Sequence, residues 1–483
     1  MPEFLQSIDI RWGQVWPYLY VALEVAAVML AIDAVMKQRT SQGAVAWAMG
    51  LIFMPLLVIP FYLLVGQRRF YGYVEARRKG DLEIQKIASD LLKEMHQSFQ
   101  PEEITQGGFA LEKLARMPFT KGNQIELLVN GDHTFQALFD AIDRATDYIL
   151  VQFYIIRHDR IGWAFQEKLS AKAAAGVKVY FMFDSIGSFN LSRRYVRKLK
   201  KSGVEVIPFR TKPINFRGRY QINFRNHRKI VVVDGKEAFV GGLNVGDEYL
   251  GHHNRLSPWR DTHLSVRGPA VQGVQLSFLE DWYWGTSEVP DLNWQPSASE
   301  QNQPVLVMPT GPADQVETCQ LMFLHAINSA TSRLWIVSPY FVPDDPIIKA
   351  IKLAAYRGVD VRILIPGKTD NRVVLLSGLA HVMDTDTESV RFYRYQKGFL
   401  HQKVVLVDDR RTYIGTANLD NRSFRLNFEL TVVIRGRLFA SKVEAMLEED
   451  FNHSVEISRK SLLQRSRIFH IVARVARLFS PLQ

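Results

Sequence analysis

Two short segments of the chain each begin with a histidine that is followed two residues later by a lysine. The first is NHRKIVVVD, Asn226 to Asp234, and the second is HQKVVLVD, His401 to Asp408. Imidazole is a nucleophile and proton carrier near neutral pH, and a neighbouring lysine supplies fixed positive charge. A lone histidine near a strand end is more often structural, but repetition of the whole pattern favours shared chemistry.

The residues after each pair predict how it is held. Both segments continue with β-branched and aliphatic residues, which indicates a buried strand. Alternate residues of a strand share a face, so each histidine projects beside its lysine, and Asp234 and Asp408 fall on the other face. We expect these two aspartates to anchor the junction between strand and turn. Each strand is followed by a small-residue turn that ends in Asn244 or Asn418, whose amides can donate hydrogen bonds to an anion.

The repeat extends upstream, because both halves read helix, strand, helix, strand and then the histidine–lysine strand. AIDRATDYILVQFYI from Ala141 matches AINSATSRLWIVSPYF from Ala326, and GVKVYFMFD from Gly176 matches GVDVRILIP from Gly358. Apolar strands alternating with helical patterns predict an α/β fold with sheets covered on both faces. We expect the two halves to pack as a pseudo-dimer, with both histidines at a common seam.

The duplicated His-x-Lys-x4-Asp pattern with its Gly-x-x-Asn turn resembles the phospholipase D superfamily over roughly residues 115–455. Within it the chain is most similar to the bacterial cardiolipin synthases, through NHRKIVVVDGKEAFVGGLNVGDEY, WRDTHLSVRGPAV and GTANLDNRSFRLNFE. The resemblance implies two tandem phospholipase D-like α/β/α halves. One departure is Gly242, where many members carry serine, so a hydroxyl donor is missing unless a backbone N–H replaces it.

The resemblance also implies a mechanism. A phosphodiester is anionic, so an enzyme without a metal needs positive charge around phosphorus and a nucleophile that works at neutral pH. By the family pattern His227 attacks and His401 is the general acid and then the base, although the residues alone leave the two roles interchangeable. The implied catalytic set is His227, Lys229, Asp234, His401, Lys403 and Asp408, with Asn244 and Asn418 at the phosphate. No metal or other cofactor is required.

Each histidine also needs an acceptor on its far ring nitrogen, to fix the tautomer and support the imidazolium. Asp261 in WRDTH and Glu429 in LNFEL are candidates, each downstream of its own motif strand. For Asp261 an ordinary salt bridge is an equally good interpretation.

The implied reaction is phosphatidyl transfer between two phosphatidylglycerol molecules, giving cardiolipin and glycerol through a phosphohistidine. A phospholipase D-type hydrolase would share every catalytic residue and would release phosphatidic acid instead. A membrane-tethered nuclease would explain the net charge of +11 as well. A catalytically silent lipid-binding scaffold would leave both histidine–lysine sets unexplained.

Two apolar segments predict a membrane anchor of two transmembrane helices. Residues 43–66 contain no charge and are long enough to cross a hydrocarbon core of about 30 Å. Residues 16–36 are interrupted by Glu24 and Asp33, and an acid within a membrane usually faces protein or water. Basic residues after the second segment predict a catalytic region on the cytoplasmic side of the bacterial plasma (inner) membrane. A hairpin of two spans would leave the N-terminus on that side too.

The rest of the chain completes the predicted organisation. Residues 1–70 form the anchor, 71–115 a charged helical connector, 116–300 and 301–455 the two halves, and 456–483 a basic amphipathic C-terminal helix. That helix suits either an anionic headgroup layer or the protein's own core. Basic residues also gather between Arg193 and Arg225, beside the first histidine. The single cysteine, Cys319, excludes an intramolecular disulfide, and we expect it to be a buried helical residue.

Overall fold

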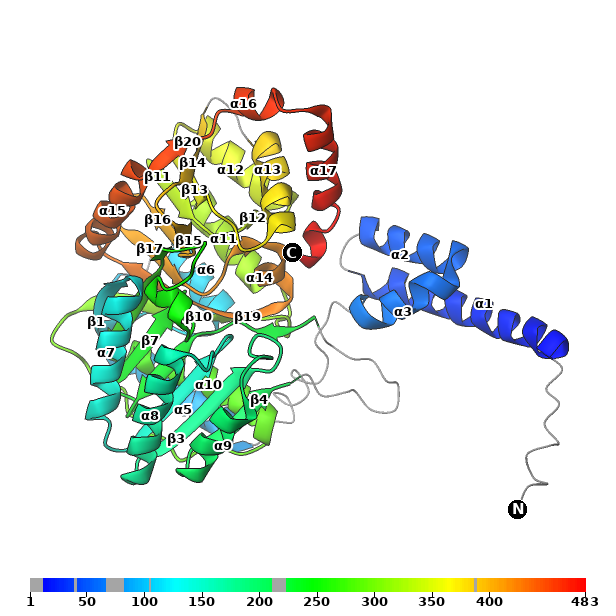
Figure 1. Cartoon of the computed structure of the whole chain (residues 1–483). Helices are drawn as coiled ribbons and strands as arrows, with labels where there is room; N and C mark the ends of the chain where they lie inside the picture. Colours follow the sequence, from blue (N-terminus) through cyan, green and yellow to red (C-terminus); the bar gives the residue numbers. More distant parts are fainter. Residues whose placement is uncertain (1–11, 39–40, 67–81, 104–105, 211–222, 386–388) are drawn as a thin grey trace, which may run out of the picture. The chain divides into compact units, whose positions relative to one another are not determined.

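The computed structural model describes residues 12–38, 41–66, 82–103, 106–210, 223–385 and 389–483 (Figure 1). The chain divides into two compact units. One contains the N-terminal helices, and the other contains the α/β structure that carries both histidine–lysine pairs.

The N-terminal unit has one helix of membrane-spanning length. Helix α1 covers Trp12–Lys37, and its residues Val15–Lys37 are long and apolar enough to cross a membrane, as predicted for residues 16–36. The prediction of a single helix over residues 43–66 is wrong, because the structure has α2 at Ser41–Phe53 and α3 at Pro55–Val65. Pro55 disfavours helical geometry at Met54 and so ends α2. At about 1.5 Å per residue, the two helices are about 20 and 17 Å long, shorter than a hydrocarbon core.

Helices α2 and α3 form a hairpin that returns to the end of α1. The ring of Trp47 lies edge-on to Tyr62, with centroids 5.2 Å apart. The Tyr62 hydroxyl donates to Asp33 Oδ2 (2.9 Å), so this acid faces protein. Gln38 Nε2, just after α1, donates to the carbonyl oxygen of Gly66 (2.7 Å), just after α3. The chain therefore enters and leaves the hairpin at the same end of α1.

The second unit is built on one continuous sheet, and its two halves meet at the antiparallel strands β1 (Thr120–Val129) and β10 (Gln303–Thr310). Outward from β1 the first half continues with β9 (Thr262–Arg267), β7 (Glu237–Gly241), β6 (Ile230–Val233), β2 (Tyr148–Phe153), β3 (Lys178–Asp184) and β4 (Glu205–Phe209). Outward from β10 the second half continues with β19 (Asn427–Arg435), β17 (Arg411–Gly415), β16 (Val404–Val407), β11 (Arg333–Val337), β13 (Asp360–Pro366), β14 (Val390–Tyr395) and β20 (Ser454–Glu456). The two strand orders mirror each other, which confirms the duplicated α/β architecture.

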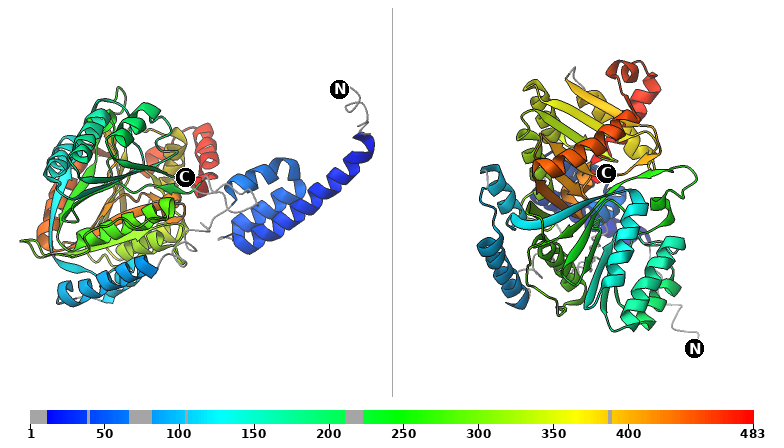
Figure 2. Two further views of the ribbon diagram at one scale, coloured as in Figure 1. Left: turned by 90° about the horizontal axis from the view of Figure 1, so that it is seen from below. Right: turned by 90° about the vertical axis from the view of Figure 1, so that its left-hand side faces the viewer.

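Helices cover both faces of this sheet (Figure 2). The first half carries α7 (Asn130–Arg144), α8 (Arg160–Ala174), α9 (Arg193–Lys201) and α10 (Ala270–Thr286). The second carries α11 (Thr318–Asn328), α12 (Asp345–Tyr356), α13 (Arg372–Thr385) and α15 (Arg437–Asn452). Within the predicted connector lie α5 (Leu82–Phe99) and α6 (Gln106–Ala115), and residues 71–81 and 104–105 fall outside the described ranges. Cys319 is buried on α11, as expected.

The C-terminal segment packs on the second half. After α16 (Arg459–Leu463), helix α17 (Arg467–Arg477) lies against α13 and buries Ala473 and Ala476. The short η2 helix (Ser480–Leu482) follows, with Ser480 Oγ within hydrogen-bond distance of Ser377 Oγ (3.0 Å). Of the two alternatives left open by the sequence, docking on the protein's own core is thus observed, while a second apolar face of α17 stays exposed.

Candidate active site

The histidine–lysine pairs lie on extended segments that cross from one half of the sheet to the other. Residues 227–229 and 401–403 precede β6 and β16, so the predicted strands are shorter than expected. Just upstream, β5 (Arg225–Asn226) pairs with β19 of the second half, and β15 (Phe399–Leu400) pairs with β8 (Trp259–Arg260) of the first. The His227 amide then donates to the carbonyl oxygen of Phe428 (2.9 Å), and the His401 amide to that of Arg260 (2.8 Å).

This crossing exchanges the carboxylate partners of the two histidines. His227 Nδ1 lies 2.9 Å from Glu429 Oε2, and His401 Nδ1 lies 2.7 Å from Asp261 Oδ2. Each acid therefore contacts the histidine of the opposite half. Its position in the sequence had instead suggested the histidine of its own half. Because the carboxylates contact Nδ1 in both rings, Nε2 is the nitrogen that faces a substrate, although His401 Nε2 also lies 3.2 Å from Lys403 Nζ.

Burial and neighbouring charges set the charge of these groups. It lowers the pKa of His227 to about 4, against the attraction of Glu429, and it also lowers the pKa of His401. Burial opposes ionisation of Asp261 and Glu429 too, but the adjacent histidines and lysines outweigh it and hold both carboxyl pKa values below their usual range. Near neutral pH the site thus contains two neutral imidazoles, each beside a carboxylate.

Further hydrogen bonds hold the carboxylates. Glu429 accepts from Thr416 Oγ1 (2.5 Å), Ser423 Oγ (2.9 Å) and Asn427 Nδ2 (3.1 Å). In the other half Gly242 takes the place of Thr416, and a Cβ built there would lie 2.0 Å from Asp261 Oδ1. The donor to that oxygen is instead the backbone N–H of Thr262 (2.8 Å). A backbone amide therefore replaces the missing hydroxyl, although it is not the amide of Gly242, which donates to the Thr262 carbonyl oxygen (3.0 Å).

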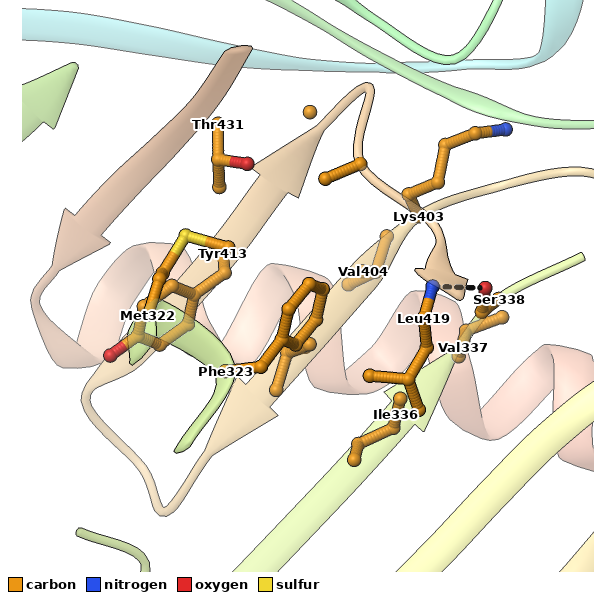
Figure 3. A pocket seen from close by; sticks show the side chains of 13 residues that line it. Met322, Phe323, Ile336, Val337, Ser338, Lys403, Val404, Tyr413, Leu419 and Thr431 are labelled. Atoms are coloured by element: carbon orange, nitrogen blue, oxygen red, sulfur yellow. Dashed lines mark hydrogen bonds between the residues drawn. The ribbon is translucent and has the colours of Figure 1, made fainter. Parts of the chain in front are cut away.

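The ammonium group of each lysine contacts the histidine two residues before it. Lys229 Nζ donates to the backbone oxygen of His227 (2.5 Å), and Lys403 Nζ lies 3.0 and 3.2 Å from the ring nitrogens of His401. Figure 3 shows Lys403 extending away from an apolar layer that includes Phe323 and Val404, around a cavity of only about 10 Å³. Burial lowers the pKa of Lys229 to about 7 and that of Lys403 to about 8.

A cavity of about 720 Å³ joins the two halves of the site. His227, His401, Asn244 and Asn418 all line it, so the structure brings these four predicted residues together. The Asn244 amide donates to the Tyr249 hydroxyl (2.9 Å), while the Asn418 side-chain oxygen has no hydrogen-bond partner among the described residues. The cavity falls in the size range of small-molecule sites.

Asp234 and Asp408 lie at the far ends of their strands, away from this cavity. Asp234 accepts from the backbone N–H groups of Thr146, Asp147 and Tyr148, at 2.8–2.9 Å. Asp408 accepts in the same way from residues 331–333. Burial opposes ionisation of Asp408, but these donors lower its pKa to about 2. Both aspartates tie the turn after the motif strand to the start of the neighbouring strand.

Other residues of the cavity were not singled out from the sequence. Asp420 at the end of β18 (Leu419–Asp420) and Arg422 on α14 (Asn421–Arg425) line it, within the segment GTANLDNRS that carried the resemblance. Tyr154 packs edge-on against His227, with centroids 5.0 Å apart, and comes from the end of β2, where no motif marks it. Burial raises the pKa of Asp420 to about 6.

Two further predictions stay predictions. Part of the predicted basic region near the first histidine, residues 211–222, lies outside the described residues, whereas α9 and Arg210 are described. Among the described residues, no group of three or more His, Cys, Asp or Glu side chains is placed to hold a metal ion.

Comparisons with known proteins identify related sequences over most of the chain. A family model described as cardiolipin synthase, PLD-like domain matches residues 138–257 and 323–451, and a phospholipase D-nuclease N-terminal model matches residues 25–67. Cardiolipin synthase A of Pseudomonas putida is 47% identical over 469 residues, which cover 96% of this chain and 98% of that protein. Cardiolipin synthase A of Pseudomonas aeruginosa is 47% identical over 468 residues, 96% of this chain and 95% of that protein.

Solved structures share the fold at low identity. The crystal structure of phosphatidylserine synthase from Haemophilus influenzae aligns with a TM-score of 0.60 at 15% identity, covering 78% of this chain and all of that one. Polyphosphate kinase from Porphyromonas gingivalis aligns with a TM-score of 0.50 at 12% identity, covering 80% of this chain and 57% of that one.

Proposed function

The chain belongs to the cardiolipin synthase family of phospholipase D-like phosphatidyltransferases, and from that premise we propose that it joins two phosphatidylglycerol molecules into cardiolipin. The observation that carries the proposal is the pair of buried histidines that line one cavity, each with a carboxylate on Nδ1. A two-step transfer needs one group that attacks and one that carries a proton, and this arrangement supplies both.

In the first step, His227 Nε2 attacks the phosphorus of one phosphatidylglycerol. A bond forms between Nε2 and phosphorus, the bond to the headgroup oxygen breaks, and His401 protonates the departing glycerol. In the second step, His401 takes the proton from the terminal hydroxyl of another phosphatidylglycerol. That oxygen attacks phosphorus, the bond to Nε2 breaks, and cardiolipin leaves with His227 regenerated. The assignment of attack to His227 follows the family pattern.

Charge complementarity supports this scheme. Both imidazoles are neutral near pH 7, so the anionic phosphodiester itself favours protonation of His401 on binding. Lys229 and Lys403 place two ammonium groups under the histidines, where they offset negative charge that develops on the phosphoryl oxygens. Asn244 and Asn418 offer amide groups at the cavity surface. Asp234 and Asp408 support the strands at the opposite end.

The first experiment is product identification. Purified protein in detergent is incubated with labelled phosphatidylglycerol alone, beside His227→Ala and His401→Ala. We expect cardiolipin and free glycerol from the native protein and at least a 10³-fold loss of both in each variant. Phosphatidic acid as the only product would make water the acceptor and overturn the transferase assignment in favour of a hydrolase. Cleavage of nucleic acid without any lipid product would favour a nuclease.

The anchor supports a place in the bacterial plasma (inner) membrane. Helix α1 is the described helix that can span it, and the α2–α3 hairpin returns to the same end of α1. Lys37, Arg39 and the basic residues 68–79 then follow on one side of the single span, which favours the cytoplasm for that side and for the catalytic unit.

A further inference from the structure

A second cleft, of about 670 Å³, opens on the first half of the catalytic unit. It lies between the turn after β3, helix α9 and the end of β4. Its apolar surface comes from Phe183, Phe189, Leu191, Val196, Val206 and Pro208. Phe189 is 73% exposed and its neighbour Ile186 is 43% exposed, so a large apolar side chain at the mouth stands in water.

The rim of this cleft is cationic. Arg193, Arg197, Lys200, Lys201 and Arg210 line it, and none of the five forms an ion pair with another described residue. Four of these cations come from α9 and the fifth, Arg210, follows β4, so basic residues of two separate elements border one apolar cleft. An apolar floor with a basic rim fits an anionic amphiphile, because guanidinium and ammonium groups bind phosphate while the floor covers hydrocarbon.

The cleft shares a wall with the active site. Ser188, which lines the cleft, donates from Oγ to the carbonyl oxygen of Tyr154 (3.0 Å) and accepts from the N–H of Ile156 (3.0 Å). Tyr154 in turn packs on the ring of His227. In the same wall Asp184 accepts from the N–H groups of Ile186 and Gly187, and from that of Asn226, the residue before His227 (3.0 Å). A single layer of residues therefore separates a molecule in the cleft from His227.

We propose that this cleft binds one phospholipid, with its phosphate on the α9 rim and an acyl chain along the apolar floor. It would hold the second lipid of the reaction close to the phosphohistidine, and this role, unlike the binding itself, rests on the proposed function. The apolar floor makes a lipid, and not a free phosphate or a nucleic acid, the occupant.

Helix α9 offers a matched pair of variants. Arg193→Glu with Arg197→Glu removes two rim cations, whereas Arg194→Glu with Lys198→Glu makes the same charge change at the same spacing on the same helix, outside the cleft. All four side chains are exposed, so neither variant disturbs the core. Lys198 loses a surface ion pair with Glu167 and a cation–π contact with Trp163, 5.7 Å from the ring centroid, and both lie outside the cleft. Phe189→Ser tests the apolar floor without creating a cavity.

The test uses the full chain in nanodiscs and a phosphatidylglycerol with a photoactivatable acyl chain. We expect cross-links within residues 183–210, reduced at least fivefold in Arg193→Glu/Arg197→Glu and in Phe189→Ser, and unchanged in Arg194→Glu/Lys198→Glu. Unlabelled phosphatidylglycerol should compete, whereas inorganic phosphate and an oligonucleotide should not. Equal loss in both charge variants, or competition by either polar anion, would overturn the proposal.

Kinetics separate this proposal from the proposed function. With phosphatidylglycerol diluted in neutral lipid, Arg193→Glu/Arg197→Glu should raise KM about tenfold and change kcat less than threefold, as expected when two phosphate contacts are lost. Cross-linking needs no turnover, so it is repeated in His401→Ala. A labelled cleft in a native protein that makes no cardiolipin would overturn the function alone. Cardiolipin synthesis without labelling of the cleft would overturn the site alone.

Discussion

Glu429 and Asp261 contact the two histidines from opposite halves of the chain, and we expect both acids to influence their chemistry. Replacing either by its amide keeps the shape but removes the negative charge that favours the imidazolium and the N–H tautomer at Nδ1. We expect Glu429→Gln and Asp261→Asn each to lower kcat by about 10²–10⁴-fold, by analogy with other carboxylate–histidine pairs. Steady-state kinetics with phosphatidylglycerol measures this, and losses below fivefold would contradict an orienting role.

The histidines and lysines of the site predict a pH dependence of the reaction. His227 must be neutral to attack, and its pKa of about 4 keeps it neutral above pH 5. His401 must carry a proton and the lysines their charge, but burial lowers all three pKa values, those of the lysines to about 7 and 8. Each required charged form is lost as pH rises through the group's pKa. We expect kcat/KM to fall steadily between pH 6 and 9, and a rising profile would be inconsistent with this assignment.

Asp408 should affect the stability of the fold and not the rate of the reaction. Its carboxylate accepts from three consecutive backbone N–H groups, and its pKa is lowered from 3.8 to about 2. It therefore stabilises the fold above about pH 4, and this contribution disappears as pH falls from about 4 to 2. We expect Asp408→Ala to cost about 1–3 kcal/mol of unfolding free energy while kcat changes less than threefold. Thermal unfolding beside the kinetic assay tests both parts, with Asp234→Ala as its counterpart in the first half.

At the scale of elements, periodicity and repetition predicted the strands, helices and two-half architecture, because local patterning carries that information. They could not predict that residues 225–227 and 399–401 leave their own half to pair across the seam. That choice depends on contacts between segments about 200 residues apart, such as the His227 N–H with the Phe428 carbonyl oxygen. The exchange of Asp261 and Glu429 follows from it. The helix break at Met54 was readable in principle, since Pro55 stands within the apolar run.

Helix α17 has an exposed apolar stripe made of Ile468, Ile471, Val475 and Leu478, which continues beside Arg467 and Arg474. Gln483, which follows α17 in the chain, lines the active-site cavity. Because the arginines complement anionic headgroups, we expect this stripe to enter the surface of an anionic bilayer. An environment-sensitive dye at Ile471→Cys, in a Cys319→Ala background, should shift to the blue in phosphatidylglycerol nanodiscs. The same dye at the exposed Ser441→Cys should not, and equal spectra would contradict the expectation.

At the scale of the whole molecule, the α2–α3 hairpin changes the expected topology. Two full spans would place the N-terminus on the same side of the membrane as the catalytic unit, whereas one span with a returning hairpin places them on opposite sides. In intact cells an impermeant maleimide should therefore react with Ser7→Cys and spare Ser441→Cys, both in the Cys319→Ala background. Labelling of neither or of both before lysis would show that the hairpin crosses the membrane.

Because each histidine is paired with the acid of the other half, the site cannot be completed until both halves have been synthesised. During synthesis the first half leaves the ribosome with His227 complete as a residue but without Glu429, which is still about 200 positions from being translated. Until the second half has folded against it, neither histidine has its acid, so we expect a nascent or truncated chain to be a poor phosphotransferase. We therefore expect the anchor to enter the membrane before the chain can react with the lipids around it.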